Sequence, residues 1–238
     1  MHTLVIHNPQ QAERGYNVET ILELLPDAHE VTAVSGRDAA IEVQPGTLYE
    51  PNYPFEMLPE EVGCFLSHRT CWQRIVDEGW DHALIVEDDM GLNLQLYDAL
   101  KKILSRNANA DSFIRLPPEN REVQHHVDDE LDGLKLITPR VIGLKSTAQL
   151  VGRNAAKRLL KASEKIDRPL DRFIQMHWVT GQRVQAIQPM AVIELHLPGI
   201  SSIVEKFKPR GLGAKLAWEW KRASYRSQIR NRPQEAYP

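Results

Sequence analysis

The sequence predicts an α/β protein in which a central sheet is covered by helices on both faces. Two observations favour this fold class. Short apolar stretches at 3–7, 30–35 and 82–86 have the length and composition of strands. Between them, the segments 17–25 and 60–78 carry apolar residues at helical spacing. Strands that alternate with helices along a chain are typical of a sheet with helices packed against it.

In the first half of the chain, proline and asparagine mark where helices end or begin. Pro26 ends the first helix, Pro59 suits the first position of the second, and Asn93 can cap a third. Residues 43–54 contain three prolines and a glycine, which predicts a loop. The expected elements are strands at 3–7, 30–35 and 82–86 and helices at 17–25, 60–78 and 94–104.

The second half begins with a predicted strand, followed by a long polar loop at 117–133 that contains the segment HHVDDE. We interpret HHVDDE as a solvated loop or a flap near an acceptor rather than as a metal site, because it lies among polar residues. The other expected elements are strands at 112–116, 134–139 and 141–151, helices at 153–163 and 169–178, and extended chain at 184–195.

Length and composition describe an ordinary globular protein of 238 residues, 42% of them hydrophobic and 26% charged. The N-terminal residues lack the basic and apolar regions of a signal peptide, which predicts a cytoplasmic protein. Cys64, His68 and Cys71 fall at i, i+4 and i+7 of one expected helix. Two cysteines about two helical turns apart are too distant to share a zinc ion or a disulfide, so free thiols are expected.

Basic residues are concentrated near the C-terminus. Residues 206–232 contain nine of the 29 Lys and Arg but one of the 32 Asp and Glu, interleaved with large apolar side chains. This pattern favours either a helix packed on the body with its charged face in water, or peripheral attachment to an anionic membrane at its inner face. Nucleic acid is not expected as a partner.

The stretch ALIVEDDMG (83–91) places three carboxylates directly after a buried strand. Ligands of α/β sheets bind outside the carboxyl ends of strands. Side chains alternate along a strand, so Glu87 and Asp89 could share one target while Asp88 faces elsewhere. Convergent carboxylates suit Mg²⁺ or Mn²⁺, and the alternative is a solvated acidic turn.

The segment 60–89 resembles the signature of glycosyltransferase family 25, which includes bacterial lipooligosaccharide glycosyltransferases and their collagen-modifying relatives. The matching residues are an E-x-G-C-x-x-S-H motif, a tryptophan and a strand that ends in E-D-D. The segment 146–174 is similar to the family's strand, helix and P-x-D segment, and AVSGRD (33–38) to its V-D-G turn. The chain departs from the family by having a single arginine in its first loop and a glutamine, Gln149, where a tyrosine is common.

This resemblance implies a GT-A-like, Rossmann-type mixed sheet and an inverting, metal-dependent transfer of a hexose from a UDP-sugar, often UDP-galactose, to a glycan acceptor such as lipooligosaccharide. It implies Mn²⁺ or Mg²⁺ as the cofactor. Our candidate for the catalytic base is Asp171, which follows Pro169 at the start of a short expected helix, and the alternative is an acid that caps this helix. The implied site residues are Glu87, Asp89 and His196 for the metal and Arg14, Gly63, Ser67, His68 and Asp88 for the donor. For Ser67 and His68 a buried polar network is the alternative, and for His196 a surface or core histidine. Gly63 would allow close approach of a backbone or of the nucleotide.

We expect residues 1–204 to form one catalytic domain, with a donor-binding half (1–105) and an acceptor-binding half (106–204), followed by the basic tail 205–238. Two other functions remain open. One is a metal-dependent phosphoester hydrolase or nucleotidyl transferase, which would need a second cluster of acids near the first. The other is a non-catalytic nucleotide- or glycan-binding relative.

Overall fold

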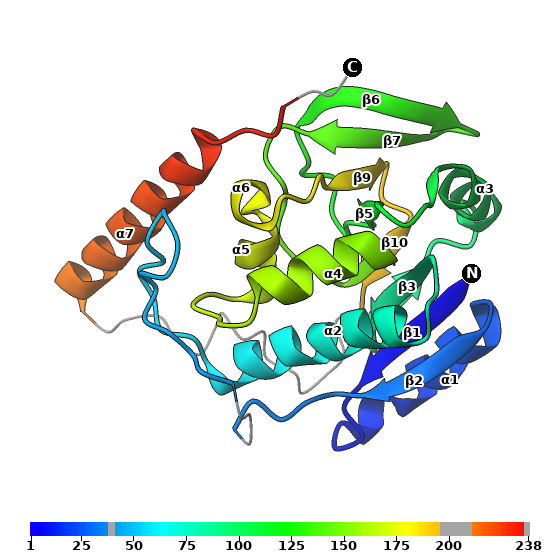
Figure 1. The fold of residues 1–238 in the computed structure, drawn as a ribbon, viewed down its shortest axis with the longest axis horizontal. Coiled ribbons are helices and arrows are strands. Elements are labelled where there is room, and N and C mark those ends of the chain that lie inside the picture. The colour runs from blue at the N-terminus through cyan, green and yellow to red at the C-terminus, as the bar shows by residue number, and fades with distance from the viewer. Residues whose placement is uncertain (38–40, 196–210, 236–238) are drawn as a thin grey trace.

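A computed structural model describes residues 1–37, 41–195 and 211–235 (Figure 1). His196 and residues 205–210 of the basic tail lie outside the described residues. An eight-stranded mixed sheet forms the centre, in the order β2-β1-β3-β8-β5-β9-β7-β6, and a two-stranded ribbon of β4 and β10 lies beside it. Strands from both expected halves of the chain join in this one sheet.

The strands of the large sheet are β1 (His2–His7), β2 (Ala28–Thr32), β3 (His82–Glu87), β5 (Phe113–Arg115), β6 (Gln124–Leu131), β7 (Leu134–Pro139), β8 (Ala148–Gly152) and β9 (Gln185–Gln188). The ribbon pairs β4 (Met90–Leu92) with β10 (Val192–Glu194). β1 is parallel to both β2 and β3, whereas β8 runs antiparallel to β3 and β5. The mixed α/β architecture expected from the sequence is therefore confirmed.

The helices are η1 (Ala12–Arg14), a short 3₁₀ turn, and α1 (Gly15–Leu24), α2 (Pro59–Asp77), α3 (Tyr97–Asn107), α4 (Arg153–Ala162), α5 (Leu170–Ile174), α6 (His177–Thr180) and α7 (Leu212–Arg230). α2 begins where the sequence predicts, with Pro59 at its first position. The Glu61 carboxylate accepts a hydrogen bond from the Leu58 backbone N–H at 2.8 Å, which satisfies one of the free donors at the helix start.

Two hydrophobic cores cover the two faces of the sheet, and the side chains of β3 alternate between them. Ala83 and Ile85 pack in the core built with α2, α4 and α5, whereas Leu84 and Val86 pack in the core built with α1 and α3. Figure 1 shows α2 and α4 together on one face of the sheet. The next two residues, Glu87 and Asp88, continue this alternation, so they leave the strand toward opposite faces.

Four expectations about single elements were wrong, and one short strand was not predicted. The polar loop predicted at 117–133 contains β6, an edge strand that exposes much of its length to solvent and therefore lacks the alternation of a half-buried strand. β4 is only three residues long and was not predicted. α3 begins at Tyr97 rather than after Asn93, whose side chain instead accepts a hydrogen bond from the Gln95 N–H. The helix predicted at 169–178 is two short helices, α5 and α6, and the strand predicted at 141–151 is confined to β8.

The described part of the basic tail is mostly one helix, α7, which lies along one edge of the molecule (Figure 1). It is fixed there by Tyr225 and Ile229, whose side chains are buried. Within the described residues, no helix is both long enough and apolar enough to cross a membrane.

Candidate active site

The carboxylates Glu87, Asp88 and Asp89 lie where β3 ends, in the middle of the large sheet. β3 is flanked by the parallel strand β1 and the antiparallel strand β8. The Glu87 N–H still donates to the Thr147 carbonyl at 2.9 Å, so the sheet holds the backbone up to the first carboxylate. Asp88 and Asp89 then form the turn into β4. The three acids thus occupy the edge at which α/β sheets bind their ligands.

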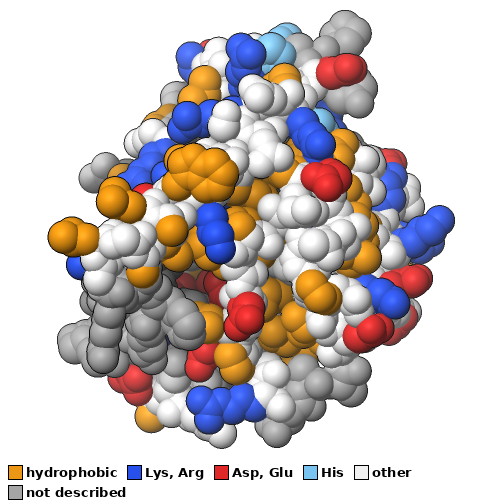
Figure 2. All heavy atoms as spheres, turned by 90° about the vertical axis from the view of Figure 1, so that its left-hand side faces the viewer, with side chains coloured by type: hydrophobic (Ala, Val, Ile, Leu, Met, Phe, Trp, Pro, Cys, Tyr) orange, Lys and Arg blue, Asp and Glu red, His pale blue; other side chains and the backbone are white. Residues whose placement is uncertain are grey.

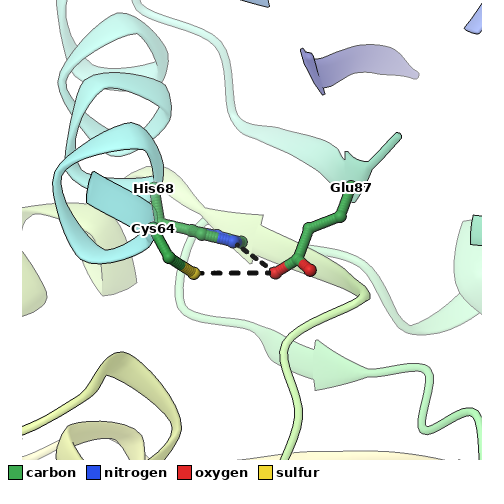
Figure 3. A group of neighbouring side chains, drawn as sticks. All are labelled: Cys64, His68 and Glu87. Atoms are coloured by element: carbon green, nitrogen blue, oxygen red, sulfur yellow. Dashed lines mark hydrogen bonds and ion pairs between the residues drawn. The ribbon is translucent and has the colours of Figure 1, made fainter. Parts of the chain in front are cut away.

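Glu87 points to the α2 face of the sheet, where Cys64 and His68 lie beside one of its oxygens (Figure 3). Oε1 accepts hydrogen bonds from His68 Nε2 at 3.0 Å and Ser146 Oγ at 2.7 Å, and Cys64 Sγ lies 4.0 Å away. Burial alone would raise the pKa of Glu87, but the hydrogen bonds from His68 and Ser146 lower it overall. Glu87 is therefore held ionised in one position.

His68 connects Glu87 to the centre of the sheet. Its ring is fully buried, and Nδ1 lies 2.6 Å from the amide nitrogen of Gln149 on β8. An amide nitrogen donates, so Nδ1 accepts and the Nε2–H faces Glu87. The neighbouring Ser67 donates to the Gly63 carbonyl and accepts from the Val34 N–H, both at 2.8 Å. Both side chains thus have buried polar partners within the protein, and the donor-binding role that the family resemblance implies stays a prediction.

Cys64, His68 and Glu87 are the one group of three metal-ligating side chains, within the part of the chain that the structure describes, whose ligand atoms all lie within 4.8 Å of one another. Burial, followed by the negative charges of Glu87 and Asp171, raises the pKa of the Cys64 thiol well above its usual value. A protonated thiol is a poor metal ligand. Cys64 and Cys71 are both free, as expected.

Asp88 points to the opposite face, where it holds the end of β1 and the first loop. Its carboxylate accepts hydrogen bonds from His7 Nδ1 at 2.9 Å and the Asn8 N–H at 3.3 Å, and it pairs with Arg14 of η1. The Asn17 side chain donates to the Asp88 carbonyl at 2.8 Å. Asp88 is 4% exposed, so this charge is buried and compensated inside the protein.

Asp89 differs from both neighbours because one of its oxygens is buried without a partner. Oδ1 has no hydrogen bond, whereas Oδ2 lies 3.4 Å from Arg14 Nη1. Burial, followed by the charge of Glu87, raises the pKa of Asp89 to about 7, against the opposing charge of Arg14. A buried carboxylate oxygen without a partner is unfavourable unless another group, such as a cation, occupies the position beside it.

Asp171 lies in the first turn of α5. Its negative charge, after burial and the charge of Glu87, contributes to raising the pKa of the Cys64 thiol. Asp171 is half-buried and acts electrostatically on Tyr53 and Glu61 as well. Because the position lies in α5 rather than a loop, its backbone is fixed by packing of Phe173 and Ile174 in the core.

Gly63 lies at a close approach between α2 and the chain that follows β2. A Cβ there would meet the Val34 carbonyl oxygen at 2.6 Å, and a Cβ at Gly36 would meet the Pro59 carbonyl oxygen at 1.8 Å. Real Cβ atoms do not approach backbone so closely, which explains glycine at both positions. The neighbour of Gly63 is therefore the protein's own backbone, one of the two possibilities the sequence raised.

The structure brings together most of the residues that the sequence singled out. Glu87 is linked to His68 and Cys64, and Asp88 to Arg14, whose guanidinium also approaches Asp89. His196 lies outside the described residues. Sequence reasoning missed Ser146 and His7, and it noted Gln149 only as a departure from the family. No local pattern marks these three, because the pairing of β8 and β1 with β3 brings Ser146 and His7 to the carboxylates and Gln149 to His68.

Comparison with known proteins identifies the family. A model of glycosyltransferase family 25, described as an LPS biosynthesis protein, matches residues 33–174, which is more than half of the chain. This chain belongs to glycosyltransferase family 25. The matched range contains α2, the carboxylate triplet and Asp171, whereas Arg14 and α7 lie outside it.

Two curated relatives show how varied the family is. Procollagen galactosyltransferase 1 of Danio rerio is 22% identical over 222 residues, which cover 82% of this chain and 37% of the relative. Inactive glycosyltransferase 25 family member 3 of Homo sapiens is 26% identical over 142 residues, which cover 58% of this chain and 23% of the relative. The chain spans about a third of the length of the curated relatives it matches.

Solved structures with a partly similar arrangement include other glycosyltransferases. The galactosyltransferase LgtC, in complex with donor and acceptor sugar analogues, has a TM-score of 0.40 at 12% identity. The alignment covers 100% of this chain and 98% of the LgtC chain. A Drosophila galactosyltransferase 7 in complex with manganese, UDP-Gal and xylobiose has a TM-score of 0.38 at 11% identity, covering 90% and 83%. At these scores the family assignment depends on the sequence match alone.

Proposed function

We propose that this protein is a metal-dependent inverting glycosyltransferase that moves a hexose, galactose in the first instance, from a UDP-sugar to a glycan acceptor such as lipooligosaccharide. The observation that carries the proposal is the buried, unpartnered Oδ1 of Asp89 at the carboxyl edge of β3, in a chain that belongs to glycosyltransferase family 25. A hard divalent cation prefers carboxylate oxygens and commonly keeps positions for phosphate oxygens.

The donor set fits Mn²⁺ or Mg²⁺. Asp89 would be the principal ligand, and Glu87 would contribute the oxygen that His68, Ser146 and Cys64 do not contact. His196 is proposed as a further ligand from outside the described residues. When bound, the cation would stabilise the negative charge that develops on the departing UDP.

The protein's own groups would position the reactants. The hydrogen bonds from His68 and Ser146 keep Glu87 ionised, so its charge faces the edge of the sheet. Asp88 and Arg14 keep the first loop attached to the end of β3, where a donor nucleotide would lie. Of the proposed donor residues, Gly63, Ser67 and His68 would act through this framework, because the two side chains are buried.

Asp171 would act as the general base. An inverting transfer needs a group that accepts the proton of the attacking hydroxyl as the new glycosidic bond forms. Asp171 is a half-buried carboxylate on α5, a different element from the one that carries Glu87 and Asp89. The cation and the base would thus be supplied by two separate elements.

A non-catalytic relative is the second candidate, because a family member described as inactive matches this chain at 26% identity. The test is mass spectrometry of products from a panel of UDP-sugars and glycan acceptors, with Mn²⁺ and with a chelator. Metal-dependent sugar transfer supports the proposal. Donor binding without transfer would favour the non-catalytic relative.

The hydrolase or nucleotidyl transferase has less support. It needs a second cluster of acids near the first, and the described residues contain no second group of three metal-ligating side chains within ligand distance. In the same panel, release of phosphate from a phosphoester without sugar transfer would favour it.

A further inference from the structure

The outer face of α7 carries three large hydrophobic side chains that are mostly exposed. Leu212 is 83% exposed, and Leu216 and Trp220 are each 72% exposed. They are spaced four residues apart, so they form one stripe along the helix. Single exposed hydrophobic residues are common, but three aligned on one helix face indicate a binding surface.

This stripe is not needed to hold α7 on the protein, because the opposite face does that. Tyr225 and Ile229 are buried, and the Tyr225 ring packs edge-on against Tyr53 at 5.5 Å. Trp218 packs against Phe55 at 5.4 Å. The helix therefore has one face fixed to the body and a separate apolar stripe directed to solvent.

Basic residues accompany the stripe along the helix. Lys and Arg in α7 number five against the single acid Glu219, and the basic residues are Lys215, Lys221, Arg222, Arg226 and Arg230. Figure 2 turns this side of the molecule toward the viewer and shows hydrophobic side chains at the surface next to basic ones. Combined apolar and positively charged surface on one helix complements an anionic lipid headgroup layer.

We propose that α7 binds the surface of an anionic lipid membrane and lies parallel to it. Leu212, Leu216 and Trp220 enter the boundary between headgroups and acyl chains, where tryptophan is favoured. The flanking lysines and arginines contact lipid phosphates. The protein is then attached peripherally, through one surface helix.

The position of α7 would bring the candidate site near that membrane. Arg172, the residue after Asp171, lies 5.7 Å from the Tyr225 ring, so the helix contacts the element that carries the proposed base. A lipid-linked acceptor would approach from this side. Membrane binding itself does not depend on the proposed function, and it is measured without any sugar or metal.

The test is sedimentation of the full chain with vesicles of phosphatidylcholine, with and without phosphatidylglycerol. We expect binding to the anionic vesicles, weakened by added salt, and little binding to neutral ones. Leu216→Ser with Trp220→Ser should abolish binding. Lys215→Gln and Arg230→Gln should each weaken it roughly fivefold. Leu94→Ser is the matched apolar control, since Leu94 is 65% exposed but lies outside α7, and Lys157→Gln is the basic control.

Three results would overturn the proposal. The first is equal binding to neutral and anionic vesicles. The second is binding by the Leu216→Ser, Trp220→Ser variant as tight as by the Leu94→Ser control. The third is a concentration-dependent dimer in analytical ultracentrifugation that this double variant abolishes, because the stripe would then be a contact between two copies. Thermal denaturation of each variant shows whether it is folded, and replacement of solvent-facing residues should leave the melting temperature unchanged.

Discussion

Glu87 and Asp88 are adjacent in sequence but lie in two different environments. Glu87 faces α2, where His68 and Ser146 bind one oxygen and leave the other free. Asp88 faces α1, where His7, Asn8 and Arg14 bind both oxygens. The first environment holds a charge at the edge of the sheet, and the second buries a charge to fasten the first loop. The difference teaches that one acidic triplet can supply both a reactive group and its structural support.

Among the three carboxylates, the largest effect on activity is expected from a substitution of Asp89. Asp89→Asn keeps the size of the side chain but removes the charge beside the unpartnered oxygen. If a cation binds there, the rate of transfer should fall by about 10³-fold or more, because the metal lowers the free energy of the charged transition state by several kcal/mol. Initial rates with a UDP-sugar and Mn²⁺ measure this. Asp111→Asn, at an exposed aspartate far along the chain, is the control and should keep full activity.

Asp171→Asn should lower the rate of transfer by at least about 10²-fold, as expected for loss of a general base. Binding of UDP should be unchanged, because the base contacts the acceptor rather than the nucleotide. Steady-state kinetics and a UDP titration on the same preparation separate the two effects. A variant that loses UDP binding in proportion to its activity would assign Asp171 to the donor site instead.

Asp88→Asn tests the structural side of the triplet. It removes one partner of a buried ion pair and leaves Arg14 without its compensating charge, so the free energy of unfolding should fall by about 3 kcal/mol. The activity of the folded fraction should fall less than about tenfold, because Asp88 would support the first loop rather than hold the cation. Urea denaturation measures the loss. Asp81→Asn is the control, since Asp81 also pairs with an arginine but its side chain is 72% exposed.

The raised pKa of Asp89 makes the stability of the protein depend on pH. The pKa of Asp89 is raised from its usual 3.8 to about 7 in the folded, metal-free protein. Between those values the unfolded chain releases the proton first, so this group makes the folded state progressively less stable as pH rises toward about 7. Denaturation midpoints across that range should decline less steeply in Asp89→Asn than in the wild-type protein. Identical slopes would contradict a raised pKa at this residue.

The smallest expected effects come from two matched hydrogen-bond deletions. Ser146→Ala removes a donor to Glu87, and Asn17→Ala removes donors to the carbonyls of Asp88 and Met90. Each should cost about 1 kcal/mol of stability. Transfer should fall about tenfold in Ser146→Ala, because Glu87 loses part of its support, and stay unchanged in Asn17→Ala. Equal activities in the two variants would contradict the assignment of a functional role to the α2 face of the sheet and a structural role to the α1 face.

Local sequence patterns predicted the framework of the site because each pattern depends on neighbouring residues. Pro59 and the apolar spacing after it located α2, and the apolar run before Glu87 located β3. The alternation of side chains along a strand predicted that Asp88 would face away from Glu87. The resemblance to the family added the segment 60–89 as a unit.

The remaining parts depend on long-range pairing, which no local pattern specifies. Ser146 and Gln149 reach Glu87 and His68 only because β8 pairs antiparallel with β3 in one particular register. β6 escaped prediction because it is an exposed edge strand without a buried face. Arg14 was expected to contact the donor, and its pairing with Asp88 depends on how the first loop folds over the end of the sheet.

The central claim is that Asp89, rather than its neighbour Asp88, provides the principal oxygen ligand for a diphosphate-bound cation. Isothermal titration of UDP into the wild-type protein, Asp88→Asn and Asp89→Asn, with Mn²⁺ and with a chelator, tests it most directly. The account predicts Mn²⁺-dependent UDP binding in the wild type and in Asp88→Asn, and its loss in Asp89→Asn. Binding that is equally strong without metal, or that survives Asp89→Asn, would contradict it.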